Sequence, residues 1–263
     1  MFSSFMTNAW IVGSVVALLA GATGFFVVLR GSSFAAHAVP NGAFAGAAGA
    51  TLVGIAPLWG MVSFAVAAAL GIGASRRHRS DVVTAMALVV MLALGAAFLS
   101  LSAAYEPQVD ALLFGEILGI SSTSMAPVFA VSIVCALALA VMYRPLVYDA
   151  TAADLARSRG VNPTLLEMGF LVTMALGAAL TVPVVGALLS FSLTVGPPAA
   201  ARLVTRRPAS ALGLSMVLSV LTLWTSIAAS YQTNLPVGFF VGVLSALVYV
   251  VLRVGTRGRA RGA

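Results

Sequence analysis

The chain has 263 residues, of which 61% are hydrophobic and only 8% are charged, with a mean hydropathy of +1.08. A soluble globular domain carries about 25% charged residues. This composition therefore excludes a soluble globular protein and indicates one that is embedded in the lipid bilayer. The net charge of +7 does not indicate nucleic-acid binding, because no basic run interleaved with aromatic residues is present. The single cysteine, Cys135, excludes an intrachain disulfide and a thiolate metal cluster.

Nine apolar segments approach the length of about 20 residues that a membrane-spanning helix needs. They are 9–29, 38–56, 58–75, 82–104, 124–143, 164–181, 183–201, 209–230 and 235–253. Pro57 and Pro183 each separate two adjacent segments, which could instead form long kinked helices because proline removes a helical hydrogen bond. We predict an all-α bundle with seven to nine spans, nine being favoured. Residues 1–253 would form a single transmembrane domain, and 254–263 a basic cytoplasmic tail.

The charged residues separate onto two sides of this arrangement. All fourteen arginines follow spans 1, 3, 5, 7 and 9, with four acidic residues on the same side, which gives 14 − 4 = +10. These four are Asp81, Asp149, Asp154 and Glu167. The other side holds only Glu106, Asp110 and Glu116. Because cytoplasmic loops collect basic residues, the N-terminus should lie outside and the C-terminus inside. Merging one pair of segments into a single kinked helix would break this alternation of sides, so the parity favours nine spans.

Residues 105–123 are too short and too acidic to cross the membrane. Within them, ALLFGEILGI predicts a short helix at the outer surface or re-entering the bilayer. Glu106, Asp110 and Glu116 would form an acidic outer rim that concentrates cations or binds a docked protein. Simple solvation of an outer loop is the alternative.

Residues 144–163 form the longest inner loop. Thr151 or Asp149 could cap a short helix near AADLARSR, and Gly160 should end it. Small and charged residues with few large apolar ones suit a helix that docks on a soluble partner.

His37 is the only histidine outside the basic cluster RRHR. Asn41 follows four residues later, so both share a face if this segment is helical. Pro40 predicts that the helix begins nearby. An imidazole facing a bundle interior can bind a transition metal or shuttle a proton, whereas the alternative is a hydrogen-bonded turn histidine.

Glycine pairs with GxxxG spacing occur at Gly42–Gly46 and Gly238–Gly242. This spacing lets helix backbones approach closely. We favour tight packing within the bundle over a specific dimer face.

The sequence lacks the motifs of membrane enzymes. Ser190 and His37 are present without GxSxG, and the two histidines cannot supply HExxH. The absence of lysine excludes a Walker A loop, so ATP hydrolysis would need another chain. We therefore expect no catalytic residues and no permanently bound cofactor.

Five segments, in order, carry a family resemblance. They are GFFVVLRGSSFAAHAVPNGAFAG, LLFGEILGIS, YDATAADLARSRGV, VVGALLSFSLTVGPPAAARLVTRR and SYQTNLPVGFFVGVL. Together they resemble the permease subunits of ABC-type zinc, manganese and iron(II) importers. The resemblance implies a permease homodimer in a bacterial inner membrane, a cytoplasmic ATP-binding-cassette ATPase and an extracytoplasmic metal-binding protein. It also implies that 144–163 is the ATPase-coupling segment, with four residues to test: Asp149, Asp154, Arg157 and Gly160.

The first of these segments departs from the family in one respect. The family usually places an aspartate there and a histidine four residues later, as metal ligands, whereas this chain has His37 and Asn41. Imidazole suits zinc, copper, iron and nickel, while carboxylate and water suit manganese better. We therefore expect transport of a divalent metal, with zinc favoured over manganese.

Two other transporter classes remain as alternatives. An ABC permease for an iron–siderophore or cobalamin-type chelate shares the architecture but tends to have a longer chain. A secondary metal carrier needs ionisable groups within its spans, and here the spans are nearly bare.

Overall fold

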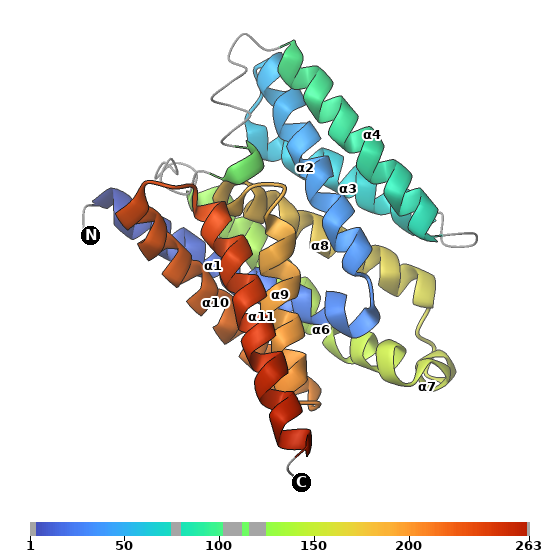
Figure 1. Cartoon of the computed structure of the whole chain (residues 1–263). Coiled ribbons are helices and arrows are strands. Elements are labelled where there is room, and N and C mark those ends of the chain that lie inside the picture. The colour runs from blue at the N-terminus through green and yellow to red at the C-terminus, as the bar shows by residue number, and fades with distance from the viewer. Residues whose placement is uncertain (1–3, 75–79, 102–111, 116–124, 262–263) are drawn as a thin grey trace.

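The computed structural model describes residues 4–74, 80–101, 112–115 and 125–261, and most of these residues lie in helices (Figure 1). In chain order the helices are α1 Ser4–Arg30, α2 Ser33–Val53, α3 Pro57–Ala74, α4 Ser80–Ser100, α6 Met125–Thr151, α7 Ala153–Ser158, α8 Pro163–Val185, α9 Ser190–Val204, α10 Pro208–Thr233 and α11 Val237–Arg261. The described part contains no β-strand. The predicted all-α fold is therefore confirmed for these residues.

Local chemistry explains where several helices begin and end. Pro57, Pro163 and Pro208 each occupy a first helical position, where a missing N–H costs no hydrogen bond. The side-chain oxygen of Asn162 accepts hydrogen bonds from the backbone N–H groups of residues 164 and 165, at 3.0 and 3.3 Å, and so caps α8. Gly54 ends α2 in the left-handed conformation with φ 76°.

Each of the nine predicted segments overlaps one long helix. Within the described residues, seven helices are long and apolar enough to cross a membrane, namely α1, α3, α4, α6, α8, α10 and α11. The other two are α2 and α9. α9 has only 15 residues, about 22 Å of helix, and α2 is rich in small residues and mostly buried.

Two predicted helix boundaries are wrong. α2 begins at Ser33 rather than near Pro40, which lies buried inside the helix. α8 likewise continues through Pro183 to Val185, because a proline removes one hydrogen bond without forcing the chain to turn. The turn comes at Gly186, whose φ of 91° is readily adopted only by glycine.

The helices form two groups joined by α8 (Figure 1). α2 packs against α3 and α4, whereas α1 packs against α6, α9 and α10, and α11 covers α9. α8 contacts α1, α2, α3 and α6, so it lies between the groups. The aromatic side chains Phe25, Phe26 and Phe170 are fully buried where α1 meets α8. The last helix continues to Arg261, so most of the predicted tail is an extension of α11.

Glycines bring helix backbones into direct contact. A Cβ atom added at Gly42 would lie 3.0 Å from the carbonyl oxygen of Phe64, and one at Gly46 would overlap the Gly60 carbonyl. The Gly42–Gly46 pair therefore packs α2 against α3 within one chain. Gly238 of the second pair faces the carbonyl oxygens of Phe114 and Val185 in the same way. Gly242 meets only a side-chain carbon of Leu189, at 3.3 Å, so the close backbone approach comes from the first pair and from Gly238.

We expect Gly46→Ala to lower the stability of the purified protein by about 1–3 kcal/mol, the usual cost of overpacking. The matched control is Gly71→Ala, because nothing lies within 4 Å of a Cβ atom added there. Thermal melts in detergent should show a lower Tm for Gly46→Ala only. Equal melting of the two variants would contradict the backbone contact.

Candidate functional site

His37 lies in the second turn of α2 and is half-buried. Its ring stands edge-on to the ring of Phe191 in α9, with centroids 5.2 Å apart. Its Nδ1 atom is buried without a hydrogen-bond partner among the described residues. A buried polar atom with no partner calls for an explanation, and an imidazole nitrogen in this state is available to a proton or a metal ion.

Asn41 lies one helical turn after His37 and is buried. Its Nδ2 donates a hydrogen bond to the backbone carbonyl of His37 at 2.9 Å. The two side chains therefore share one face of α2, as their spacing requires. The amide nitrogen is held against the helix, which leaves Oδ1 as the atom of this side chain able to contact a cation.

A small chamber, lined mostly by apolar groups, adjoins α2 at Ala36 and Pro40. Its volume is about 20 Å³, enough for roughly one water molecule, and α1, α2, α8 and α9 enclose it. Pro40 lines it beside the hydroxyl-bearing residues Thr23, Thr181 and Thr194. The Thr23 hydroxyl is buried with no partner in the described part of the chain. Three threonines thus lie close to α2 at Pro40, although His37 and Asn41 do not themselves line the chamber.

The described residues contain no group of three or more histidine, cysteine, aspartate or glutamate side chains that could hold a metal ion. A closed structural zinc site uses four protein ligands. His37 and Asn41 supply two ligands at most. Such a pair suits brief contact with a passing ion better than storage.

A buried ionic cluster joins three helices nearby. Arg30, the last residue of α1, donates from Nη1 to Asp149 of α6 at 2.7 Å and from Nη2 to Glu167 of α8 at 2.5 Å. The Arg30 side chain is only 4% exposed, and its guanidinium lies 5.8 Å from the ring centroid of Phe170. Sequence reasoning missed this cluster, although it placed all three residues at span ends on one side.

The predicted inner-loop helix is present as α7, Ala153–Ser158. Neither predicted cap is correct, because Thr151 donates to the Val147 carbonyl and Asp149 binds Arg30. Gly160 ends the helix as predicted, with φ 77°.

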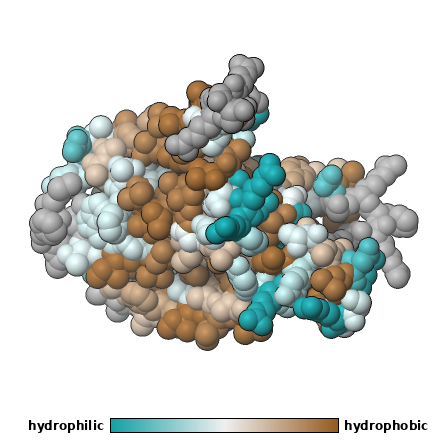
Figure 2. Space-filling view, turned by 90° about the horizontal axis from the view of Figure 1, so that it is seen from below, coloured by the Kyte–Doolittle hydropathy of each residue, from teal (hydrophilic) through white to brown (hydrophobic). Residues whose placement is uncertain are grey.

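Asp154 is fully exposed and Arg157 is mostly exposed, 4.0 Å apart. Figure 2, seen from below, shows hydrophilic side chains gathered at the centre and right of the face, among hydrophobic ones. Asp154 and Arg157 are therefore open to a partner, whereas Asp149 faces inward.

Glu106, Asp110 and Glu116 lie outside the described residues. The described residues 112–115 contact the break between α8 and α9. The carbonyl oxygen of Leu112 accepts a hydrogen bond from the backbone N–H of Ala187 at 2.9 Å. Gly115, with φ 81°, packs directly on the backbone of Val185 and Gly186. Residues 112–115 thus cover the turn between these two helices.

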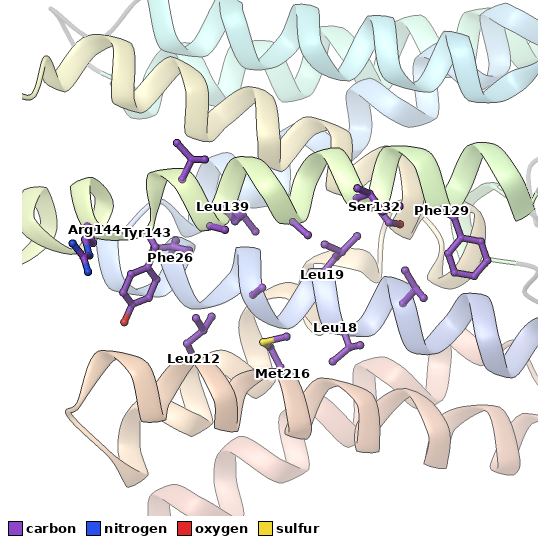
Figure 3. Close-up of a pocket in the computed structure, with 16 residues that line it drawn as sticks. Leu18, Leu19, Phe26, Phe129, Ser132, Leu139, Tyr143, Arg144, Leu212 and Met216 are labelled. Carbon is purple, nitrogen blue, oxygen red and sulfur yellow. The ribbon is translucent and has the colours of Figure 1, made fainter.

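An apolar groove of about 760 Å³ runs along α1, α6 and α10 (Figure 3). Arg144 and Tyr143 lie at one end, and Phe129 lies at the other. Side chains of all three helices line the groove between these ends, among them Leu18, Leu19, Ser132, Leu139, Leu212 and Met216.

Comparisons with known proteins agree with this architecture. The model of the ABC 3 transport family matches residues 2–255. A membrane protein of Treponema pallidum, whose name assigns it to a metal transport system, is 28% identical over 264 residues, which cover 98% of each chain. The manganese import system permease protein ScaB of Streptococcus parasanguinis is 26% identical over 94% of this chain and 89% of its own.

The fold is similar to that of a solved structure, PsaBC from Streptococcus pneumoniae in complex with Fab. The TM-score is 0.86 at 23% identity, over 95% of this chain and 91% of the other. Because the family match spans almost the whole sequence, the chain belongs to the ABC 3 transport family and is a transport component of a bacterial inner membrane, not an enzyme.

Proposed function

We propose that the chain is the permease subunit of an ATP-driven importer of a divalent metal ion, with zinc favoured over manganese. The family match over residues 2–255 carries this proposal. The names of the relatives support a metal cargo, since they describe metal transport and manganese import. The permease domain would be residues 1–253, followed by the basic cytoplasmic tail 254–263.

The preference for zinc rests on the ligand chemistry of α2. His37 offers a buried, unpartnered imidazole nitrogen, and Asn41 offers an amide oxygen on the same face. Imidazole nitrogen suits zinc, whereas manganese prefers carboxylate and water oxygen. The named manganese permeases are relatives at about a quarter identity, which leaves room for a different ion in this chain.

Nine spans with the N-terminus outside and the C-terminus inside fit this function. α2 and α9 are less apolar or shorter than the other spans, but protein surrounds much of each, so lipid need not solvate them. The ion pairs of Arg30 support the predicted alternation of sides, because they bring the end of α1, the end of α6 and the start of α8 together on one side. These three places lie on the cytoplasmic side in the predicted parity.

The two faces would bind different partners. On the inner face, α7 would contact the ATPase through Asp154 and Arg157, while Asp149 and Gly160 fix the two ends of the segment. On the outer face, the rim of Glu106, Asp110 and Glu116 would receive the metal-binding protein or attract cations.

A second copy of the permease would cover the groove in Figure 3. Ile133, Leu137 and Val141 are exposed on α6 at a spacing of four residues, so they form a ridge along the rim of this groove, which Ile133 and Val141 also line. A two-fold interface places the same surface on both partners, and a ridge next to a groove is self-complementary in that arrangement. The homodimer would thus bury the exposed face of α6.

His37→Ala should lower zinc uptake at limiting zinc by at least about tenfold. Removing a side chain that only supports a metal ligand already lowers metal affinity or activity by about 10- to 100-fold, so loss of a ligand should cost at least the lower value. His37→Asp should raise manganese uptake relative to zinc, because a carboxylate replaces the imidazole. Uptake of both ions by cells would be measured, with Phe34→Ala on the exposed side of α2 as control. Normal zinc uptake by His37→Ala would exclude it as a ligand.

Charge reversal at the exposed face of α7, by Asp154→Arg or Arg157→Glu, should reduce co-purification of the ATPase and metal uptake together. Asp81→Arg makes the same charge change in the first turn of α4 and should leave both unaffected. If ATPase yield and uptake are intact after reversal at Asp154 and Arg157, α7 does not form the coupling contact.

Cysteines placed singly at Ile133, Leu137 and Val141, in a chain with Cys135→Ala, should form covalent dimers on oxidation in native membranes. The reason is that two-fold packing brings each ridge close to its copy. Cysteines at Val89 and Val90, exposed on α4, are the control. Dimers from α4 alone would place the interface elsewhere.

A further inference from the structure

Arg30, Asp149 and Glu167 form a cluster of three charged side chains in a chain that has only 21, as 14 basic and 7 acidic residues. The side chains are 4%, 16% and 11% exposed. Placing charges in such surroundings costs free energy, and a well-packed apolar group of similar volume often stabilises a protein at least as well. Stability alone therefore does not explain the cluster.

The cluster lies between the two functional segments of the chain. Asp149 is near the end of α6, four residues before the start of α7. Arg30 ends α1, and only Gly31 and Ser32 separate it from α2, which carries His37. A displacement of α7 can therefore reach the α1–α2 turn through a single ion pair.

Glu167 extends this connection to a third helix. It lies in the second turn of α8, whose later residues Gly177 and Thr181 line the small chamber beside α2. The guanidinium of Arg30, at the end of α1, thus contacts both α6, which leads to α7, and α8, which forms a wall of the chamber. The contact with Asp149 of α6 is one hydrogen bond from Nη1, and the contact with Glu167 of α8 is one from Nη2.

The guanidinium has a further arrangement open to it. Arg30 donates one bond to each carboxylate, from Nη1 to Asp149 and from Nη2 to Glu167, and Nε is buried without an acceptor among the described residues. A bidentate pair, with two parallel N–H···O bonds to one carboxylate, is a favourable geometry for arginine. Because Nε and Nη2 point to the same side of the guanidinium, Arg30 could form such a pair with Glu167 when its contact with Asp149 lengthens. The cluster thus has a second bonding pattern open to it, as a switching element requires.

We propose that Arg30 is the positioning residue that couples movement of α7 to α2, by shifting its guanidinium between Asp149 and Glu167 during the transport cycle. This inference rests on the proposed function. Arg30 itself touches no metal ion and acts through the helix that it ends.

The test uses the complete complex of permease and ATPase in proteoliposomes, with zinc uptake and ATP hydrolysis measured on the same samples. Asp149→Asn and Glu167→Gln should assemble and hydrolyse ATP, but the ATP consumed per zinc ion imported should rise about fivefold or more, the lower range of measured coupling between sites. Arg253→Gln removes an exposed arginine on α11 and should leave this ratio unchanged.

Arg30→Lys addresses the case in which the amide variants fail to assemble. Lysine keeps the charge and can bind both carboxylates, but it cannot form the bidentate pair. This variant should assemble, keep the thermal stability of the complex and still show the raised ratio of ATP to zinc. A cluster that only fastens the helices together would instead change the melting temperature and leave the ratio at its wild-type value, and that result overturns the inference.

The wild-type complex separates this inference from the proposed function. If wild-type proteoliposomes import neither zinc nor manganese, the proposed function fails. If they import metal and all three variants keep the wild-type ratio, the proposed function stands and only the coupling role of Arg30 is lost.

Discussion

Hydrocarbon solvates neither ions nor unpaired backbone amides, and this constraint shapes every part of the structure. The chain satisfies this constraint because its backbone amides are paired within helices and its charged residues lie near the helix ends. Where a charged residue is buried, as Arg30 is, it lies against carboxylates and an aromatic ring. Where the backbone leaves a helix inside the bundle, as at Gly186, the turn is covered by residues 112–115, and Leu112 accepts a hydrogen bond from the next residue.

The same constraint explains why two helices of unusual composition belong to the bundle. α2 is rich in glycine and alanine and contains His37 and Asn41, which lipid would solvate poorly. Its neighbours α3, α4, α8 and α9 surround it, and the glycines at 42 and 46 allow α3 to approach the backbone. Within the bundle, these polar residues are thus contacted largely by protein rather than by lipid.

Function follows from the proximity of these features. The helix with the unpartnered imidazole starts three residues after Arg30, and Arg30 pairs with Asp149 at the end of α6 that leads to α7. A weak contact with only two ligands would let an ion pass. The short connection between α7 and α2 would let ATP hydrolysis on a partner chain move the helix that carries these ligands. In the proposed permease, these two properties together would form a transport path that a separate ATPase subunit opens.

The sequence by itself determined the helical class and most helix positions, because hydrophobic length and proline placement act locally. The family followed from its short motifs, and α7 with its end at Gly160 followed from local turn chemistry. The sequence did not show that Pro40 and Pro183 lie within helices, since a helix tolerates a proline when its neighbours hold it in place. It also could not pair Arg30 with Asp149 and Glu167, which lie 119 and 137 residues away. Only the tertiary structure decided which charges are buried together and which, like Asp154, stay open to a partner, because burial depends on helices that are distant in the chain.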